Sequence, residues 1–387
     1  MNKLLLQTIT PGKYFSDKLF LDEKYILLST ETPMTQELRS RLERWKFSYI
    51  HTAGELRDQP ATDHGEVSAS TGNIELDLKE STEFKETYKT YISMMSFTEK
   101  MISDFVSKEE LSQRLISEKL KEVIDLIKDR RRYALRLTEF RTSTHNHIVD
   151  HAVKTSFLAV ALGMSLKLPP HKLIELATAS LLHEIGLVRL PPQLYMSNRK
   201  LNPQEKKAIT AHTVLGFKIL KQFSFPMPVC LGVLECREHP DGSGYPRGLT
   251  ADRISVYAKI IGVSSAYAAL ISDRPHRKAF LGHESILDLL KGRGRTYDDS
   301  VLKALLANLS IYPIGSFVLL NNGAKAMVVE TNSESPRNPA VRVVAGPNNE
   351  RYSSSQIVNT QEKEYQIVRA LSHEEKLEIA PETKQPG

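Results

Sequence analysis

The chain has 387 residues, of which 41% are hydrophobic and 25% are charged, and this balance excludes a disordered or fibrous protein. Its formal net charge of +6 permits an anionic partner but is too small an excess to indicate one. The two cysteines, Cys230 and Cys236, exclude a disulfide framework and favour a reducing compartment. Because no stretch approaches the ~20 apolar residues of a membrane helix, we expect a cytoplasmic protein without a membrane span.

Residues 1–56 predict a small α+β module at the N-terminus. Strand-like runs occupy residues 18–30 and 47–54, and apolar residues at helical spacing lie between them at 35–45. Residues 57–79 are rich in Asp, Ser, Thr, Gly and Pro and contain few bulky apolar residues, which indicates a linker. We expect this linker to act as a hinge.

Residues 80–144 predict two amphipathic connecting helices. Within 91–106 and 115–127, apolar residues recur at a spacing of three and four with charges between them. The basic run KDRRR at 128–132 ends the second of these stretches. Such a run can bind phosphate, but cations that stabilise the C-terminus of a helix are the commoner use, and we favour that interpretation.

Residues 145–310 have an almost wholly helical pattern and contain nearly all the histidines of interest. Residues 311–372 change character, because strand-like runs alternate there with turns rich in Asn, Gly and Pro. We therefore predict a mainly α protein, a helical bundle followed by a short C-terminal β segment. Residues 373–387 are expected to form a tail.

Four side chains on apolar helical backgrounds are candidates for a metal site: His151, His183, Glu184 and His212. Neutral nitrogen and anionic oxygen ligands from separate buried helices suit a divalent transition metal, because together they offset the cost of desolvating the cation. For each histidine taken alone, a hydrogen-bonded core residue is the commoner alternative.

A second motif, REHPDGSGYPRGL at 237–249, contains closely spaced glycines and implies a tight loop. With LLHEIG at 181–186 and SDRPHRKAF at 272–280, it resembles the HD-GYP family of cyclic di-GMP phosphodiesterases. The resemblance covers about 145–310. It implies an HD-type helical bundle and a site for two or three metal ions, commonly iron or manganese, which activate water to cut a phosphodiester.

The resemblance implies that part of the family's metal site is retained. His151, His183 and His212 match three of the family's histidines, and Glu184 stands where the family has a bridging aspartate. Cys236 takes the place of one further histidine and could ligate as a thiolate. These five side chains could hold one divalent metal, iron or manganese, and the absence of any metal is the other outcome we expect.

Other positions of the family's site are lost. The second histidine of the family's adjacent pair falls on Arg237, whose guanidinium is always charged and has no lone pair for a metal. A later aspartate ligand falls on Ser265, and a lysine falls on Leu187. We therefore predict a degenerate member of the family, to which we assign no catalytic residue.

The part of the site that recognises ligand or partner is better preserved. Arg274 and Arg277 match positions where the family places basic side chains against phosphates, although a salt bridge on the surface is an equal alternative for each. The signature loop, which the resemblance associates with substrate and with diguanylate cyclase partners, is matched by Asp241, Gly242, Gly244, Tyr245, Pro246 and Gly248.

These observations favour a cyclic di-GMP effector or scaffold that binds the dinucleotide or a diguanylate cyclase (GGDEF) partner, with absent or weak hydrolysis. A metal-dependent cyclic di-GMP phosphodiesterase with a rebuilt site is the first alternative. A nucleotide-independent interaction scaffold is the second. No specific nucleic-acid partner is predicted, because the basic run at 291–295 has no aromatic residues interleaved for stacking.

Overall fold

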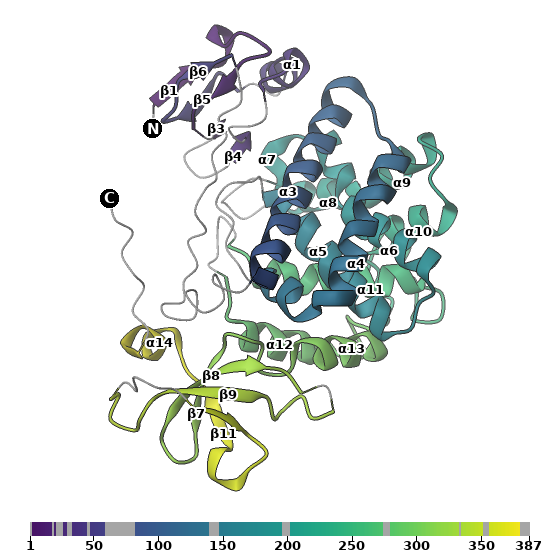
Figure 1. Ribbon diagram of the computed structural model, residues 1–387. Coiled ribbons are helices and arrows are strands. Elements are labelled where there is room, and N and C mark those ends of the chain that lie inside the picture. Colours follow the sequence, from purple (N-terminus) through teal and green to yellow (C-terminus); the bar gives the residue numbers. More distant parts are fainter. Residues whose placement is uncertain are drawn as a thin grey trace.

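The computed structural model describes residues 2–17, 19–20, 26–28, 33–44, 47–58, 82–138, 147–195, 202–273, 279–332, 334–350 and 356–379. These residues form an N-terminal module, a helical body and a C-terminal sheet, in chain order (Figure 1). The prediction of a mainly α protein with a small α+β module first and a short β segment last is confirmed. The predicted linker lies outside the described residues from position 59 onward.

The N-terminal module contains a four-stranded antiparallel sheet with strand order β1-β5-β3-β4, and β2 pairs with β6 in a separate ribbon. Its apolar core includes Leu6, Met34 and Ile50, and Tyr195 of the helical body packs against this core. The elements are β1 Asn2–Leu5, η1 Leu6–Thr8, β2 Tyr14–Phe15, β3 Leu19–Phe20, β4 Ile26–Leu28, α1 Gln36–Arg44, β5 Tyr49–Thr52 and β6 Leu56–Arg57.

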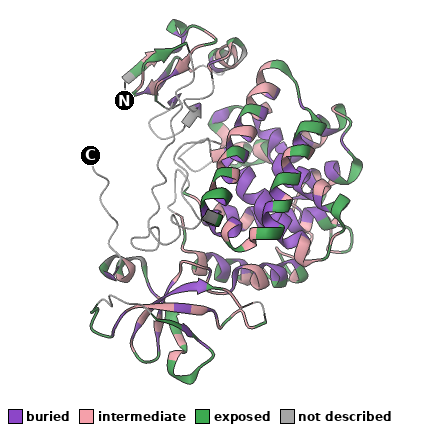
Figure 2. Cartoon of the chain, viewed as in Figure 1, coloured by how far each residue is buried: buried purple, intermediate pink, exposed green. Residues whose placement is uncertain are grey.

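The helical body is organised around α5, which is buried at every position from Ile148 to Gly163. A helix that is apolar on all sides belongs inside a protein, and α3, α4, α6, α11 and α13 surround this one. Figure 2 shows buried residues concentrated in this body. Its helices are α3 Thr82–Lys108, α4 Gln113–Leu137, α5 His147–Ser165, α6 Pro170–Leu182, η2 Ile185–Arg189, α7 Pro192–Tyr195, α8 Pro203–Thr210, α9 His212–Gln222, α10 Met227–Glu235, α11 Val256–Leu270, α12 Gly282–Lys291 and α13 Asp299–Leu309.

From the sequence we predicted that the basic run at 128–132 ends a helix, and this prediction is wrong. Helix α4 continues to Leu137, because the buried residues Ala134 and Leu135 extend its apolar face beyond the run. The backbone of Arg130 is not helical (φ −134°, ψ 39°), so the helix kinks inside the run. The arginines after the kink therefore belong to a helical segment that packs against other parts of the chain.

The C-terminal sheet is antiparallel, with strand order β10-β9-β8-β7-β11. Both of its faces are apolar: one includes Phe317 and Met327, and the other includes Val318 and Val328. Residues 373–379, which we had assigned to a tail, form α14, because Ile379 is buried on the Phe317 face. The strands are β7 Phe317–Leu320, β8 Lys325–Glu330, β9 Ala340–Ala345, β10 Ile357–Asn359 and β11 Ile367–Ala370, with the short helix η3 Lys363–Tyr365 before β11.

Across the ranges given above, no helix combines the length and the apolar character needed to cross a membrane.

Candidate functional site

The candidate metal ligands come from three helices that meet inside the helical body. His151 lies in the second turn of α5, His183 follows the last residue of α6, and His212 is the first residue of α9. The glycine of the HEIG run explains how these parts meet. A Cβ atom on Gly186 would lie 2.0 Å from the carbonyl oxygen of His212, so only glycine lets η2 lie directly against α9.

His151, His183 and Glu184 are brought together as one buried group, in which one ligand atom of each lies within 4.8 Å of the others. Glu184 Oε1 is 3.7 Å from His151 Nε2 and 4.0 Å from His183 Nε2. Within the part of the chain that the structure describes, the group has these three members, and His212 and Cys236 lie outside it.

Two of the histidines are oriented by backbone carbonyls. His183 Nδ1 lies 2.7 Å from the Ser180 oxygen, and His212 Nδ1 lies 2.7 Å from the Ile209 oxygen. Because a carbonyl oxygen only accepts, Nδ1 carries the proton and Nε2 keeps its lone pair. Neither Nε2 atom has a hydrogen-bond partner among the described residues.

Both of these imidazoles are neutral near pH 7. Burial lowers the pKa of His183 to about 4, against the opposing effect of the Glu184 carboxylate. Burial, reinforced by the positive charge of Arg237, also lowers the pKa of His212. A neutral ring with its proton on Nδ1 can ligate a metal or accept a hydrogen bond through Nε2.

Arg237 places a permanent positive charge in this cluster. Its Nη2 atom donates to Glu184 Oε1 at 2.8 Å, and its Nη1 atom donates to Ser265 Oγ at 3.1 Å. Arg237 follows the end of α10, Ser265 lies on α11 and Glu184 follows α6, so the guanidinium joins these three parts of the helical body directly. Glu184, Arg237 and Ser265 are three of the positions at which the resemblance to the HD-GYP family implied changes.

The donor atoms of the cluster suit a divalent transition metal, but their arrangement does not. Glu184 Oε1, the oxygen nearest to both imidazoles, already accepts a charge-assisted hydrogen bond from Arg237. A metal on this oxygen would lie beside a guanidinium that has no lone pair to offer and repels it. Arg237 therefore takes the position that a metal would occupy on this carboxylate, and the residues do not fit a metal bound beside the guanidinium.

Cys236 is arranged as a buried thiol rather than as a ligand. Its Sγ–H donates to the Val233 carbonyl at 3.3 Å, and burial raises its pKa to about 11. A thiolate is the form that binds metals. The geometry therefore gives no support to the thiolate ligand that we considered from the sequence.

The signature loop is held by carboxylates to which the sequence analysis gave no role. Buried Glu238 accepts hydrogen bonds from the backbone N–H groups of Arg247 and Leu249, at 2.7 and 2.8 Å. Buried Glu235 pairs with the guanidinium of Arg247 in the loop, and it also accepts from the Ser255 N–H at 2.7 Å. Neither position has a local sequence signal, because each acts on backbone groups that only the folded loop brings near.

The residues of the loop that we predicted to bind ligand take different positions. Asp241 accepts hydrogen bonds from the Ser243 N–H at 3.0 Å and its hydroxyl at 2.6 Å, and Gly242 has a positive φ of 79°, so these residues shape the turn. A Cβ on Gly244 would lie 2.3 Å from the His239 nitrogen. Pro246 follows Tyr245 through a cis peptide bond.

Tyr245 brings the loop to the histidine cluster. Its ring lies edge-on to the His212 ring, with the two centroids 6.3 Å apart, and its N–H donates to the Arg237 carbonyl at 3.0 Å. Burial raises the pKa of Tyr245, so its hydroxyl keeps its proton and can donate. Loop and cluster thus form one site. The predicted phosphate contacts Arg274 and Arg277 lie outside the described residues.

A helical body with a His–acid pair after one helix, histidines from two others and a glycine-rich loop beside them defines an HD-type domain. Comparison with known families agrees: the HD domain family matches residues 121–301, and a KOW domain associated with HD domains matches residues 317–378. Residues 121–301 are therefore similar to the HD domain family, which agrees with the resemblance seen in the sequence.

Several curated relatives of the chain are named cyclic di-GMP phosphodiesterases. The protein PdeB of Borreliella burgdorferi is 33% identical over 225 residues, which cover 57% of this chain and 59% of that protein. A cyclic di-GMP phosphodiesterase of Pseudomonas aeruginosa is 32% identical over 213 residues, which cover 54% of this chain and 50% of that protein. The chain thus spans only half to three fifths of each relative.

A solved structure supports the fold. A protein from Bdellovibrio bacteriovorus described as an HDG"Y"P protein matches with a TM-score of 0.50 over 79% of this chain and 97% of that one. The two sequences are 15% identical, so this likeness concerns the fold alone.

Proposed function

We propose that the chain takes part in cyclic di-GMP signalling as a binding protein, with absent or weak hydrolysis. The names of its curated relatives support the ligand class. One observation carries the proposed loss of hydrolysis: Arg237 donates to Glu184 Oε1 at 2.8 Å, on the carboxylate that stands at the family's bridging position.

The chemistry of the guanidinium supports binding without cleavage. An arginine binds phosphate oxygens through charge-assisted hydrogen bonds, so Arg237 can attract an anionic dinucleotide as a metal would. It cannot lower the pKa of a water molecule to make a nucleophile, which is the metal's part in phosphodiester hydrolysis. Tyr245 adds a hydroxyl donor and an aromatic ring at the same place.

We further propose that the protein works in the cytoplasm and passes the bound state to other parts of the signalling system. The signature loop between 241 and 248 would serve a diguanylate cyclase partner, and the linker at 57–79 would let the N-terminal module respond. This proposal assumes that the chain is divided into an N-terminal module, a linker, connecting helices, an HD domain and a C-terminal extension.

A second candidate function, a metal-dependent cyclic di-GMP phosphodiesterase, is favoured by a different observation. His151, His183 and Glu184 are grouped with suitable ligand atoms, and the Nε2 lone pair of His183 is available. This function requires Arg237 to leave Glu184, and its guanidinium has a route outward because 26% of the side chain is exposed.

The deciding experiment is metal analysis of protein reconstituted anaerobically with iron and manganese, followed by a cyclic di-GMP turnover assay on the same sample. We expect no stoichiometric metal and no conversion to pGpG or GMP. Bound metal together with turnover would overturn the binding proposal in favour of the phosphodiesterase. Calorimetry with cyclic di-GMP then separates a nucleotide effector, which gives heat of binding, from a nucleotide-independent scaffold, which gives none.

A further inference from the structure

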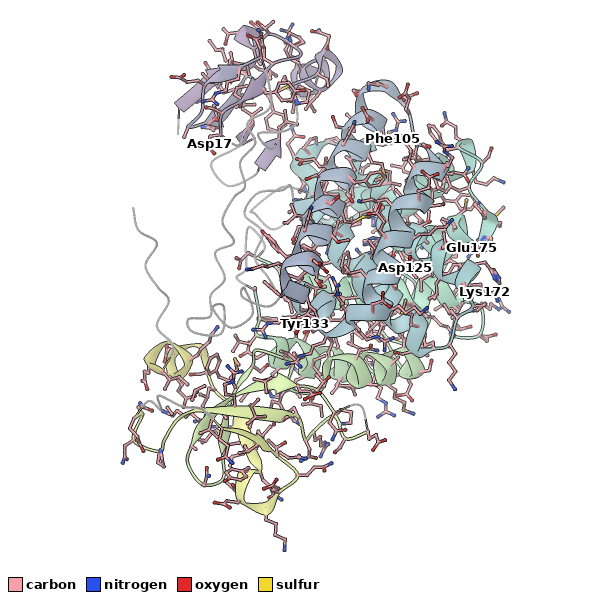
Figure 3. All side chains as sticks on the ribbon, viewed as in Figure 1. Asp17, Phe105, Asp125, Tyr133, Lys172 and Glu175 are labelled. Carbon is pink, nitrogen blue, oxygen red and sulfur yellow. The ribbon has the colours of Figure 1, made fainter. Side chains whose placement is uncertain are left out.

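A second candidate site lies outside the HD cluster, where the end of α4 and α13 meet the chain leading to the C-terminal sheet. It is a pocket with a volume of about 260 Å³. Arg131, Arg132 and Arg136 of α4 line it together with Asn308 of α13 and Thr331, which follows β8. Figure 3 labels Tyr133 on this stretch of α4, at the end of the helical body that faces the sheet.

The kink in α4 brings these arginines to the pocket. The non-helical backbone at Arg130 redirects the last two turns of the helix, and the three arginines that line the pocket all follow it. Arg130 itself is paired with Glu86 across to α3. The basic run thus divides at the kink, with Arg130 serving the helix pair α3–α4 and the later arginines serving the pocket.

The pocket is strongly positive. No carboxylate occurs among the described residues that line it. The contacts of Arg131 and Arg132 among the described residues are also uncharged, since Arg131 donates to the Met164 sulfur at 3.7 Å and Arg132 donates to the Val329 carbonyl. Each guanidinium has five N–H donors, so these two bonds leave most of the donors for an anion.

The other residues that line the pocket indicate which chemical groups a bound anion would carry besides its negative charge. Leu135, Pro313 and Ile314 supply apolar surface. The amide of Asn308 donates to Ser165 Oγ at 2.8 Å and to the Ala304 carbonyl at 2.7 Å, while its own oxygen is buried without a hydrogen-bond partner among the described residues. A bound molecule that carries a hydroxyl or N–H group would satisfy that oxygen.

We propose that this pocket binds a small phosphate monoester of the size of a nucleoside monophosphate. Arg131 and Arg132 would hold the phosphate through charge-assisted hydrogen bonds, the apolar wall would receive the base, and Asn308 would accept from a hydroxyl or amine. The volume lies just below the usual range for ligand pockets, about 300–1,000 Å³, and leaves no room for a cyclic dinucleotide. The proposal does not depend on what the HD site binds.

Occupation of this pocket would fasten the sheet to the helical body. Arg132 already reaches the backbone of β8 at Val329, and Thr331 brings the next turn to the same pocket. A phosphate between these groups adds bonds on both sides of the junction. Amide hydrogen exchange in β8 is therefore expected to slow when the ligand binds.

The test is calorimetric titration of the full chain with GMP, with inorganic phosphate and guanosine as separate probes. The HD site is filled with cyclic di-GMP beforehand, so that heat from that site is removed. We expect GMP to bind, and phosphate and guanosine each to bind more weakly than GMP. Arg131→Gln is expected to weaken GMP binding about tenfold or more, since a charge-assisted hydrogen bond is lost.

Arg114→Gln is the matched control, because Arg114 lies on the same helix with its side chain 82% exposed and pairs only weakly with Glu118 at 3.6 Å. It should bind GMP like the wild type. If Arg131→Gln misfolds, Arg132→Gln replaces it, since Arg132 is exposed. The proposal is overturned if the wild type shows no GMP heat at millimolar concentration, if the arginine variants bind like Arg114→Gln, or if prior cyclic di-GMP abolishes the GMP heat.

Discussion

The Glu184 carboxylate is neutralised by the protein's own guanidinium. Only 11% of the Glu184 side chain is exposed, and Arg237 Nη2 lies 2.8 Å from its Oε1 atom. Removing one partner of a buried pair leaves an uncompensated charge and costs about 3–5 kcal/mol. The pair therefore stabilises the cluster when no metal is bound. Without Arg237, the buried Glu184 carboxylate would face two imidazoles with no positive charge beside it.

Restoring the family's residues at three of the altered positions, 184, 237 and 265, is expected to restore metal binding. The triple variant Arg237→His, Glu184→Asp, Ser265→Asp should hold at least one iron or manganese ion per chain by elemental analysis. A chelator should also lower the melting temperature of this variant, because metal that binds only the folded state stabilises it. The double variant Glu184→Asp, Ser265→Asp is the control and should stay metal-free, since Arg237 is still present. A metal-free triple variant would show that Arg237 is not what keeps metal out.

The two cysteines give a measure of how closed the site is. Both are buried, and burial raises the pKa of Cys230 and raises that of Cys236 to about 11. Thiolate is the reactive form, so at pH 8 both thiols stay protonated in the folded protein. We expect no reaction with a disulfide reagent under native conditions and reaction of two thiols after unfolding. Fast native reaction of one thiol that is lost in Cys236→Ser would mean that Cys236 is a thiolate, as a metal ligand would be.

The sequence could indicate the residue types of the site but not their partners. That a guanidinium replaces a histidine is visible at position 237, where its permanent charge and lack of a lone pair already exclude it as a metal ligand. Its bonds to Glu184 and Ser265 were not predictable, because they join Arg237 to residues that lie 53 and 28 positions away. The protonation of Cys236 was missed for a similar reason, since burial is a property of the folded chain.

The meeting of η2 with α9 depends on one glycine. Gly186→Ala would place a methyl group 2.0 Å from the His212 carbonyl, where backbone has to move. We expect a loss of about 2 kcal/mol or more in the free energy of unfolding, measured by urea titration. Because His183 and Glu184 precede this glycine directly, the same variant should weaken cyclic di-GMP binding.

Gly262→Ala is the matched control, for which we expect the free energy of unfolding to rise instead of fall. Gly262 lies inside α11, and a methyl group there would meet the Cys236 carbonyl at 3.5 Å, an ordinary contact. Replacing a helical glycine by alanine should stabilise the protein by about 0.5–1 kcal/mol. Equal effects of the two substitutions would contradict the role we give to the close approach at Gly186.

Helices were easier to predict from the sequence than their ends. The apolar spacing that predicted two helices in 80–144 corresponds to α3 and α4, but the second helix passes through its basic run instead of stopping there. The cause is tertiary: Leu137 packs into the main core, and that burial outweighs the local tendency to end. Short strands such as β6 carry too few residues to show alternation and were not predicted.

The C-terminal sheet is joined to the helical body through more than one contact, and Figure 1 shows it beside α12 and α13. His283 of α12 places its ring on Tyr312, with centroids 4.6 Å apart and planes 13° apart, and its Nδ1 donates to the Ile311 carbonyl at 2.8 Å. Tyr312 in turn packs against the Val318 face of the sheet. This contact could not be predicted from the sequence. The change of pattern near residue 311 indicated a boundary between helical body and sheet, but not which side chains meet across it.

His283→Ala is therefore expected to loosen the sheet without disturbing the HD site. The ring contact and the hydrogen bond together contribute about 2 kcal/mol. Their loss should speed amide exchange in β7 and β8 about thirtyfold, because exchange follows the free energy of local opening. Amides of α5 should not change, since that helix is held by its own buried surroundings. His171→Ala, at an exposed position of α6, is the control. Uniform acceleration across α5 and β8 would mean that body and sheet open together, and that His283 stabilises the protein as one unit.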